Sequence, residues 1–133
     1  MSDLSICFDF PEFECEEGWH SIVNSVLLCI DRHLRFSPQR SPDNRFSISQ
    51  IKQKMGGLRI YCVNSNSYID GVIDLAETMA YNTCEVTGNP GFLHQKEHFI
   101  KALSPQMAEQ MGFVPSGKDH RTIHASKKKS STT

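Results

Sequence analysis

The chain has 133 residues, 38% of them hydrophobic and 22% charged, with a formal net charge of −1, which is typical of a single ordinary globular domain. Its longest apolar run, residues 26–30, is far too short to cross a bilayer, and residues 1–17 are acidic, unlike a signal peptide. We therefore expect a cytoplasmic protein with no membrane partner.

Two elements are predicted in the first third of the chain. Residues 5–13 alternate between large apolar and other side chains, which is typical of a strand that ends at or just past a proline. Residues 19–34 carry apolar side chains at helical spacing. The acidic stretch before them and Arg32 and Arg35 near their end suit the charges at the two termini of a helix.

A β-hairpin is predicted over residues 46–63, with Gly56 and Gly57 at its tip because two-residue hairpin turns require positive φ angles. The change of parity along the first strand predicts a bulge near Ser49 and Gln50. This turn gives a mostly apolar face with the pairs Met55–Leu58, Gln53–Ile60 and Ile51–Cys62. The second face has the pairs Lys52–Tyr61 and Lys54–Arg59. Like charges directly opposite each other are unfavourable, so we expect carboxylates to meet this second face.

Two more helices are predicted further along. Residues 64–67 supply turn residues and an N-cap for a helix with the apolar stripe Tyr68, Ile69, Val72, Ile73, Ala76, Met79 and Ala80. Gly71 lies inside this helix, which predicts that another backbone packs close to it. Residues 105–111 form a short helix that Gly112 stops.

This order of elements predicts an α+β fold. We expect a single two-layer domain, with two helices on one face of an antiparallel sheet that has the hairpin at its centre. The domain spans residues 1–115, with residues 83–113 as a small appendage. Residues 116–133 are polar and basic and are expected to form a flexible tail.

Catalytic signatures are missing from the sequence. The cysteines are odd in number and without a close pair, which indicates reduced and mostly buried thiols: Cys7, Cys15, Cys29, Cys62 and Cys84. No local motif supports a Cys/His nucleophile, and the carboxylates of residues 12–17 are more typical of a solvated or helix-capping stretch. We expect no catalytic residues and no enzyme activity.

Three stretches together resemble a widespread, largely uncharacterised family of small bacterial and phage proteins. They are residues 14–19 (ECEEGW), 50–61 (QIKQKMGGLRIY) and 84–91 (CEVTGNPG). The resemblance covers about residues 13–113 and is most specific in the hairpin. In that family the third stretch normally reads C-E-x-C-G-x-P-G and is followed by L-C-x-x-H, which together look like a small zinc-binding ribbon.

This chain departs from the family pattern at the ligand positions. Cys84 is present, but Thr87 stands at the second position, and Ser104 and Met107 stand at the later two. Structural zinc sites need four nitrogen or sulfur donors, and hydroxyl and thioether groups are poor substitutes. The resemblance therefore implies a degenerate zinc-ribbon-like appendage with no metal and no cofactor. A rearranged site is the alternative left open, made of Cys84, His94 and His98.

Charge is strongly segregated along the chain. Residues 1–31 hold seven carboxylates and no lysine or arginine, whereas residues 118–129 hold five basic residues and one aspartate. Such segregation bears on partners rather than on fold. We infer a non-enzymatic protein-binding inhibitor, most simply an immunity protein that neutralises a basic, nuclease-type toxin. Its partner-binding residues are predicted to be Asp9, Glu12, Glu14, Glu16, Glu17 and Asp31.

The alternative is a phage-derived, nucleic-acid-associated adaptor with a decayed zinc ribbon. It would bind phosphates through the second face of the hairpin and the basic tail, with the binding residues Lys52, Lys54, Arg59 and Tyr61. Nucleic acid is the less favoured partner, because the acidic N-terminal segment is expected to lie over that face and neutralise it.

Overall fold

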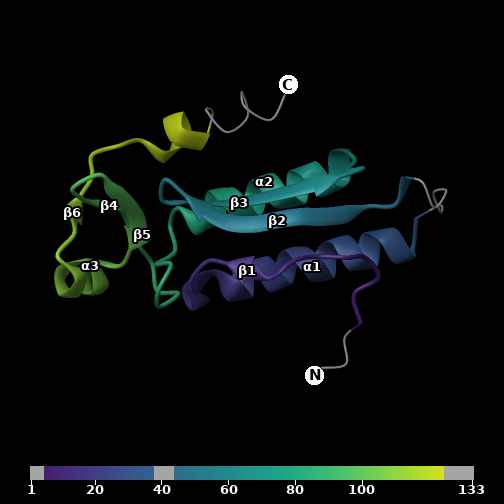
Figure 1. Cartoon of the computed structure of the whole chain (residues 1–133), viewed down its shortest axis with the longest axis horizontal. Coiled ribbons are helices and arrows are strands. Elements are labelled where there is room, and N and C mark those ends of the chain that lie inside the picture. Colours follow the sequence, from purple (N-terminus) through teal and green to yellow (C-terminus); the bar gives the residue numbers. More distant parts are fainter. Residues whose placement is uncertain (1–4, 38–43, 125–133) are drawn as a thin grey trace.

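The computed structural model describes residues 5–37 and 44–124, and within these ranges the strands form two small sheets (Figure 1). The first sheet has the order β1-β2-β3, with β1 at Phe13–Glu14, β2 at Ser47–Lys54 and β3 at Gly57–Val63. The second has the order β5-β4-β6, with β4 at Phe92–Lys96, β5 at Phe99–Leu103 and β6 at Val114–Pro115. The predicted α+β class is confirmed.

The first sheet is mixed rather than antiparallel, because β1 runs parallel to β2 while β3 runs antiparallel to it. The β2–β3 register shifts between Ile48 and Gln50, where the sequence predicts a bulge. Strand β1 is much shorter than the predicted strand over residues 5–13. The rest of that segment pairs with the sheet at a bridge between Asp9 and Ser47, and its Phe8 side chain joins the main core.

The hairpin tip lies one residue earlier than predicted. Met55 and Gly56 form the turn, with φ angles of 53° and 83°, and Lys54 pairs with Gly57. The actual cross-strand pairs therefore include Ile51–Ile60, Gln53–Leu58 and Lys52–Arg59. Gly57 is needed for space rather than for its φ angle, because a Cβ there would lie 2.5 Å from the hydroxyl of Tyr81.

Two helices share one hydrophobic core with the first sheet. Helix α1 (His20–Arg35) follows a 3-10 turn, η1 (Glu17–Trp19), and contacts helix α2 (Ser67–Ala80). The Asn66 side chain caps α2 by accepting the Ile69 N–H at 2.9 Å, as the turn residues predict. The largest fully buried apolar side chains of this core are Trp19, Ile30, Ile51, Leu58, Ile69 and Tyr81.

The stripe predicted for α2 is partly wrong. Ile69, Ile73 and Ala76 are buried, but Tyr68 is 43% exposed and Met79 is 50% exposed. Helix α2 packs mainly against β3 and α1, and Tyr68 and Met79 point away from the buried side of the helix. Nothing lies within 4 Å of where a Cβ on Gly71 would stand, so the predicted close approach of another backbone is absent.

The appendage contains the second sheet and helix α3 (Pro105–Met111). Ser104 caps α3 by accepting the Met107 N–H at 3.2 Å, and Gly112 ends it with a φ of 80°. The short helix and its stop therefore match the prediction. The β4–β5 hairpin was not predicted, because its two strands mix polar and apolar residues without regular alternation.

The first part of the predicted tail contains a short helical segment. Residues 120–124 are helical, and Ile123, 9% exposed, joins the main core. The His124 ring contacts the Asp74 carboxylate of α2 at 2.9 Å. A polar stretch thus packs against the main domain through one apolar side chain and through its histidine rings. Residues 125–133, the rest of the predicted tail, lie outside the described residues.

Candidate protein-docking surface

An acidic segment, residues 9–17, runs along the outer edge of the first sheet beside β2 (Figure 1). Its backbone is held at several points. The Ile48 N–H donates to the Asp9 carbonyl at 3.0 Å, and the Phe13 ring packs against the core and edge-on to the ring of His20. This segment is therefore a fixed part of the fold rather than a loose arm.

The carboxylates of this segment face solvent. Five predicted partner-binding residues are exposed and form no ion pair with any residue that the structure describes: Asp9, Glu12, Glu14, Glu16 and Glu17. Glu14 lies next to Lys52 in the parallel register of β1 and β2. The segment pairs along the edge of β2, so Glu14 is the acidic residue that the register sets beside the basic hairpin face.

Asp31, the sixth predicted residue, is engaged within the chain. Its carboxylate accepts hydrogen bonds from the Arg35 side chain and the Cys7 N–H, both at 2.8 Å, and its side chain is 15% exposed. Burial alone would raise the pKa of Asp31, but the hydrogen bonds from Arg35 and Cys7 outweigh it and lower the pKa. Asp31 therefore links the N-terminal segment to α1 and does not belong to the group of exposed carboxylates.

A close joint connects the acidic segment to the appendage. The Gly18 N–H donates to the Glu85 carbonyl at 2.7 Å, and the Trp19 indole N–H donates to the Thr83 carbonyl at 2.9 Å. A Cβ on Gly18 would collide with the carbonyl oxygens of Cys84 and Glu85. Two of the three stretches that carry the family resemblance, residues 14–19 and 84–91, therefore meet in this joint.

Glu85 is the buried polar centre of the joint, with 1% of its surface exposed. Its carboxylate accepts the Glu16 N–H at 3.2 Å and lies 3.5 Å from the Lys101 ammonium group. Burial, together with the carboxylates of Glu85 and Glu16, raises the pKa of the Cys15 thiol to about 11. Sequence reasoning missed Glu85. Its only local signal is its place between two apolar residues, Cys84 and Val86, where a buried carboxylate needs a hydrogen-bond or charge partner.

The second face of the hairpin keeps only part of its predicted set. Lys54 is exposed and Lys52 and Tyr61 are half-buried, but Arg59 is only 2% exposed. The Arg59 guanidinium donates to the Tyr81 hydroxyl at 2.9 Å, which turns it away from solvent and relieves its cross-strand pairing with Lys52. Arg59 is therefore removed from the candidate nucleic-acid surface.

A buried polar network beside Arg59 holds the C-terminal residues. Glu77 of α2 accepts the Ile60 N–H of β3 at 2.8 Å and lies 3.7 Å from the His124 ring. The His120 ring stacks on Tyr81 with centroids 4.8 Å apart. These groups are spaced along the sequence without any local motif, so the sequence did not reveal them. Their contacts indicate a structural role.

The positions that resemble zinc ligands come together around Cys84. Burial by itself raises the pKa of this thiol, but hydrogen bonds from the Thr87 side chain and from the backbone of Ser104, Thr87 and Val86 outweigh it and lower the pKa. Met107, at the fourth position, packs against the same small cluster. Cys84 is thus a buried acceptor of several hydrogen bonds.

Within residues 5–37 and 44–124, no three His, Cys, Asp or Glu side chains gather closely enough to hold a metal ion. The alternative site of Cys84, His94 and His98 is therefore not assembled. His94 is buried with its Nδ1 2.8 Å from the Phe92 carbonyl, while the exposed His98 ring stacks on Phe99.

Comparison with known proteins identifies no relative, since no family model, curated protein or solved structure matches the chain. Among the helices in the described part of the chain, none combines the length and apolar character needed to span a bilayer. Any functional conclusion therefore depends on the surfaces themselves.

Proposed function

We propose that this chain is a non-enzymatic inhibitor that binds a basic protein through residues 9–17, most simply an immunity protein that neutralises a nuclease-type toxin in the cytoplasm. The observation that carries the proposal is the set of five exposed carboxylates on a fixed backbone, without ion pairs to any described residue.

Rigidity matters as much as charge in this proposal. A fixed array of like charges has already met the ordering cost that a flexible acidic tail would meet on binding. The array therefore selects a complementary basic surface and raises the rate of encounter, an effect that spans about 10-fold to 1,000-fold and weakens with salt. A basic nuclease, whose own surface must attract phosphates, presents such a surface.

The test compares two charge reversals that change the net charge equally. Glu14→Lys with Glu16→Lys alters the acidic segment, and Glu97→Lys with Glu109→Lys alters exposed positions of the appendage. Proteins captured from the native host are identified by mass spectrometry, and association with the purified partner is measured at two salt concentrations. We expect a basic partner whose association slows about tenfold or more with the first variant only.

Neutralisation is read separately, by co-expressing the captured partner with each variant and following growth. The wild type and the Glu97/Glu109 variant should restore growth that the partner arrests. A partner that binds both variants equally well, or one whose binding is insensitive to salt, would contradict docking through the acidic segment.

The second candidate function is a nucleic-acid-associated adaptor with a decayed zinc ribbon. The convergence of Thr87 and Ser104 on Cys84 favours it, because these are ligand positions of the resembled family. Without Arg59, the nucleic-acid surface of such an adaptor would consist of the exposed Lys54 and the half-buried Lys52 and Tyr61. An electrophoretic shift with nucleic acid that salt and a Lys52→Gln/Lys54→Gln variant abolish supports this function, and a shift that neither affects contradicts it.

A further inference from the structure

The outer side of helix α2 carries an apolar stripe. Tyr68, Val72, Leu75 and Met79 follow one another at steps of four, three and four residues, the spacing that helices use to pack against another helix. Leu75 is 62% exposed, Met79 50% and Tyr68 43%, and only Val72 is half-buried. A contiguous exposed apolar stripe marks an interaction surface.

The stripe borders helix α1, so the two helices share one apolar seam. The Tyr68 ring stacks on the His33 ring of α1 with centroids 4.2 Å apart. Cys29 and Ile22 lie one and three turns before His33 on the same side of α1, and both are half-buried. The first sheet lies in front of both helices in Figure 1, so the outer side of the helix pair is turned away from the sheet.

The charges beside this seam differ between the two helices. Helix α2 carries three carboxylates and no lysine or arginine, whereas α1 carries Arg32 and Arg35 against Asp31. Arg35 is paired with Asp31 at 2.8 Å, but the exposed Arg32 and Asp70 form no ion pair with any described residue. A well-matched partner would therefore place an acid opposite α1 and a base opposite α2.

The two helices run antiparallel along the seam. The stack of His33 on Tyr68 joins the end of α1 to the beginning of α2. At the opposite end, the Trp19 indole N–H donates to the Thr83 carbonyl at 2.9 Å, which joins the beginning of α1 to the end of α2. Residues close to His33 in α1 are therefore level with residues close to Tyr68 in α2.

A second copy of this chain meets the charge requirement by symmetry. Arg32 and Asp70 lie at the same end of the helix pair, so a two-fold axis along the helices sets Arg32 of each copy beside Asp70 of the other. Each α1 is then antiparallel to the other copy's α2, as in an antiparallel four-helix bundle. An axis across the helices would instead set the two acidic α2 helices against each other.

We propose that the outer face of the α1–α2 pair binds a second copy of this chain, with each α1 against the other copy's α2. Helices of 16 and 14 residues are about 24 and 21 Å long and pack about 8–10 Å apart, so the contact is small. Small interfaces hold weak or transient complexes, so the association is reversible and depends on concentration. Residues 9–17 lie along the edge of β2, so each dimer presents two acidic segments.

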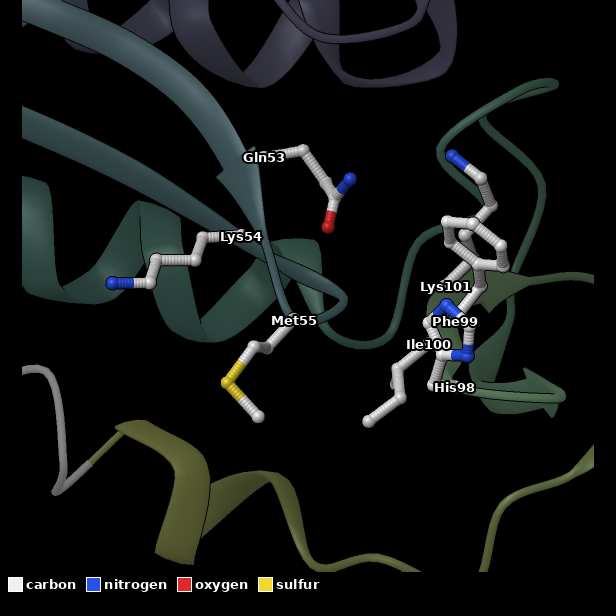
Figure 2. A pocket seen from close by; sticks show the side chains of 7 residues that line it. All are labelled: Gln53, Lys54, Met55, His98, Phe99, Ile100 and Lys101. Carbon is white, nitrogen blue, oxygen red and sulfur yellow. The ribbon is translucent and has the colours of Figure 1, made fainter.

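Sedimentation equilibrium of the full chain, from micromolar to near-millimolar concentration, measures the dissociation constant of the dimer. Leu75→Ala with Met79→Ala should raise this constant about tenfold or more, because each copy loses two apolar side chains from the contact. The matched control, Val114→Ala with Met55→Ala, removes side chains that are 61% and 51% exposed. These lie in the appendage and in the cleft between the two hairpins (Figure 2), so the constant should not change.

Two charge reversals test the pairing itself. Arg32→Glu and Asp70→Lys each place like charges together at both ends of the symmetric contact, and each should weaken the dimer about fivefold or more. An equimolar mixture of the two variants should dimerise as well as the wild type, because both charge pairs of the heterodimer are then attractive. Both positions are exposed, and circular dichroism checks that each variant keeps the fold.

The outcomes that overturn the proposal are distinct. A wild type that stays monomeric at near-millimolar concentration removes the dimer. A dimer that the Leu75/Met79 variant leaves intact uses another surface, and charge variants that stay weak when mixed exclude the axis along the helices. A foreign protein that a monomeric chain binds at this face also overturns it. None of these outcomes bears on the proposed inhibitor function, which is tested at Glu14 and Glu16.

Discussion

Replacing Gly18 by alanine should break the joint between the main core and the appendage. The added Cβ would stand 2.6 Å from the Glu85 carbonyl carbon, whereas non-bonded carbons rest at about 3.5–4.0 Å. The two segments must therefore separate by roughly 1 Å, which disrupts the 2.7 Å hydrogen bond from Gly18 to Glu85. That bond contributes about 1 kcal/mol and the overpacking costs about 1–3 kcal/mol, so we expect a loss of about 2–4 kcal/mol.

Urea unfolding followed by tryptophan fluorescence suits this measurement, because the single tryptophan, Trp19, is the next residue and is fully buried. Gly71→Ala is the matched control, since it makes the same change on α2 where nothing lies within 4 Å. It should stabilise the protein by about 0.5–1 kcal/mol through helix propensity. A Gly18→Ala protein that unfolds at the wild-type urea concentration would refute the steric reasoning.

Three further outcomes follow from single residues. Tyr81→Phe should lower the free energy of unfolding by about 1–3 kcal/mol in urea titrations, because the buried Arg59 guanidinium loses the hydroxyl that accepts from it. The lowered pKa of Asp31 stabilises the folded state above the ordinary aspartate pKa of about 4, and this stability is lost as the pH falls through the folded-state value. Acid titration followed by circular dichroism should therefore show a smaller loss in Asp31→Asn than in the wild type. The Cys15 thiol, with its pKa of about 11, should react slowly with iodoacetamide at pH 8 in mass-spectrometric mapping, and quickly once urea unfolds the chain.

The sequence predicts those parts of the fold that local patterns determine. Periodicity locates both long helices. Asn66 marks the start of α2 and Gly112 the end of the short helix α3, because caps depend on a few neighbouring atoms. The hairpin is also located, but its tip is shifted by one residue. Two adjacent glycines serve two different needs there, since Gly56 takes a positive φ and Gly57 makes room for Tyr81.

Long-range contacts decide what the sequence could not show. Arg59 looks like a surface cation in its strand, and only the fold brings Tyr81 to it and buries it. Asp31 also looks like a surface charge in its helix. Only the fold brings the Cys7 N–H, 24 residues earlier in the sequence, to its carboxylate. The exposure of the carboxylates in residues 9–17 also depends on long-range contacts, because charge alone equally favoured their lying over the basic hairpin face.

Glu77 has a consequence for how copies of this chain behave at high concentration. The outer border of β3 would otherwise offer the Ile60 N–H to any extended peptide, and such borders seed strand-by-strand growth into aggregates. The Glu77 carboxylate occupies that N–H from the protein's own helix. The edge of β3 therefore cannot pair with another chain's strand at Ile60, and the Glu77 carboxylate helps to prevent edge-to-edge aggregation.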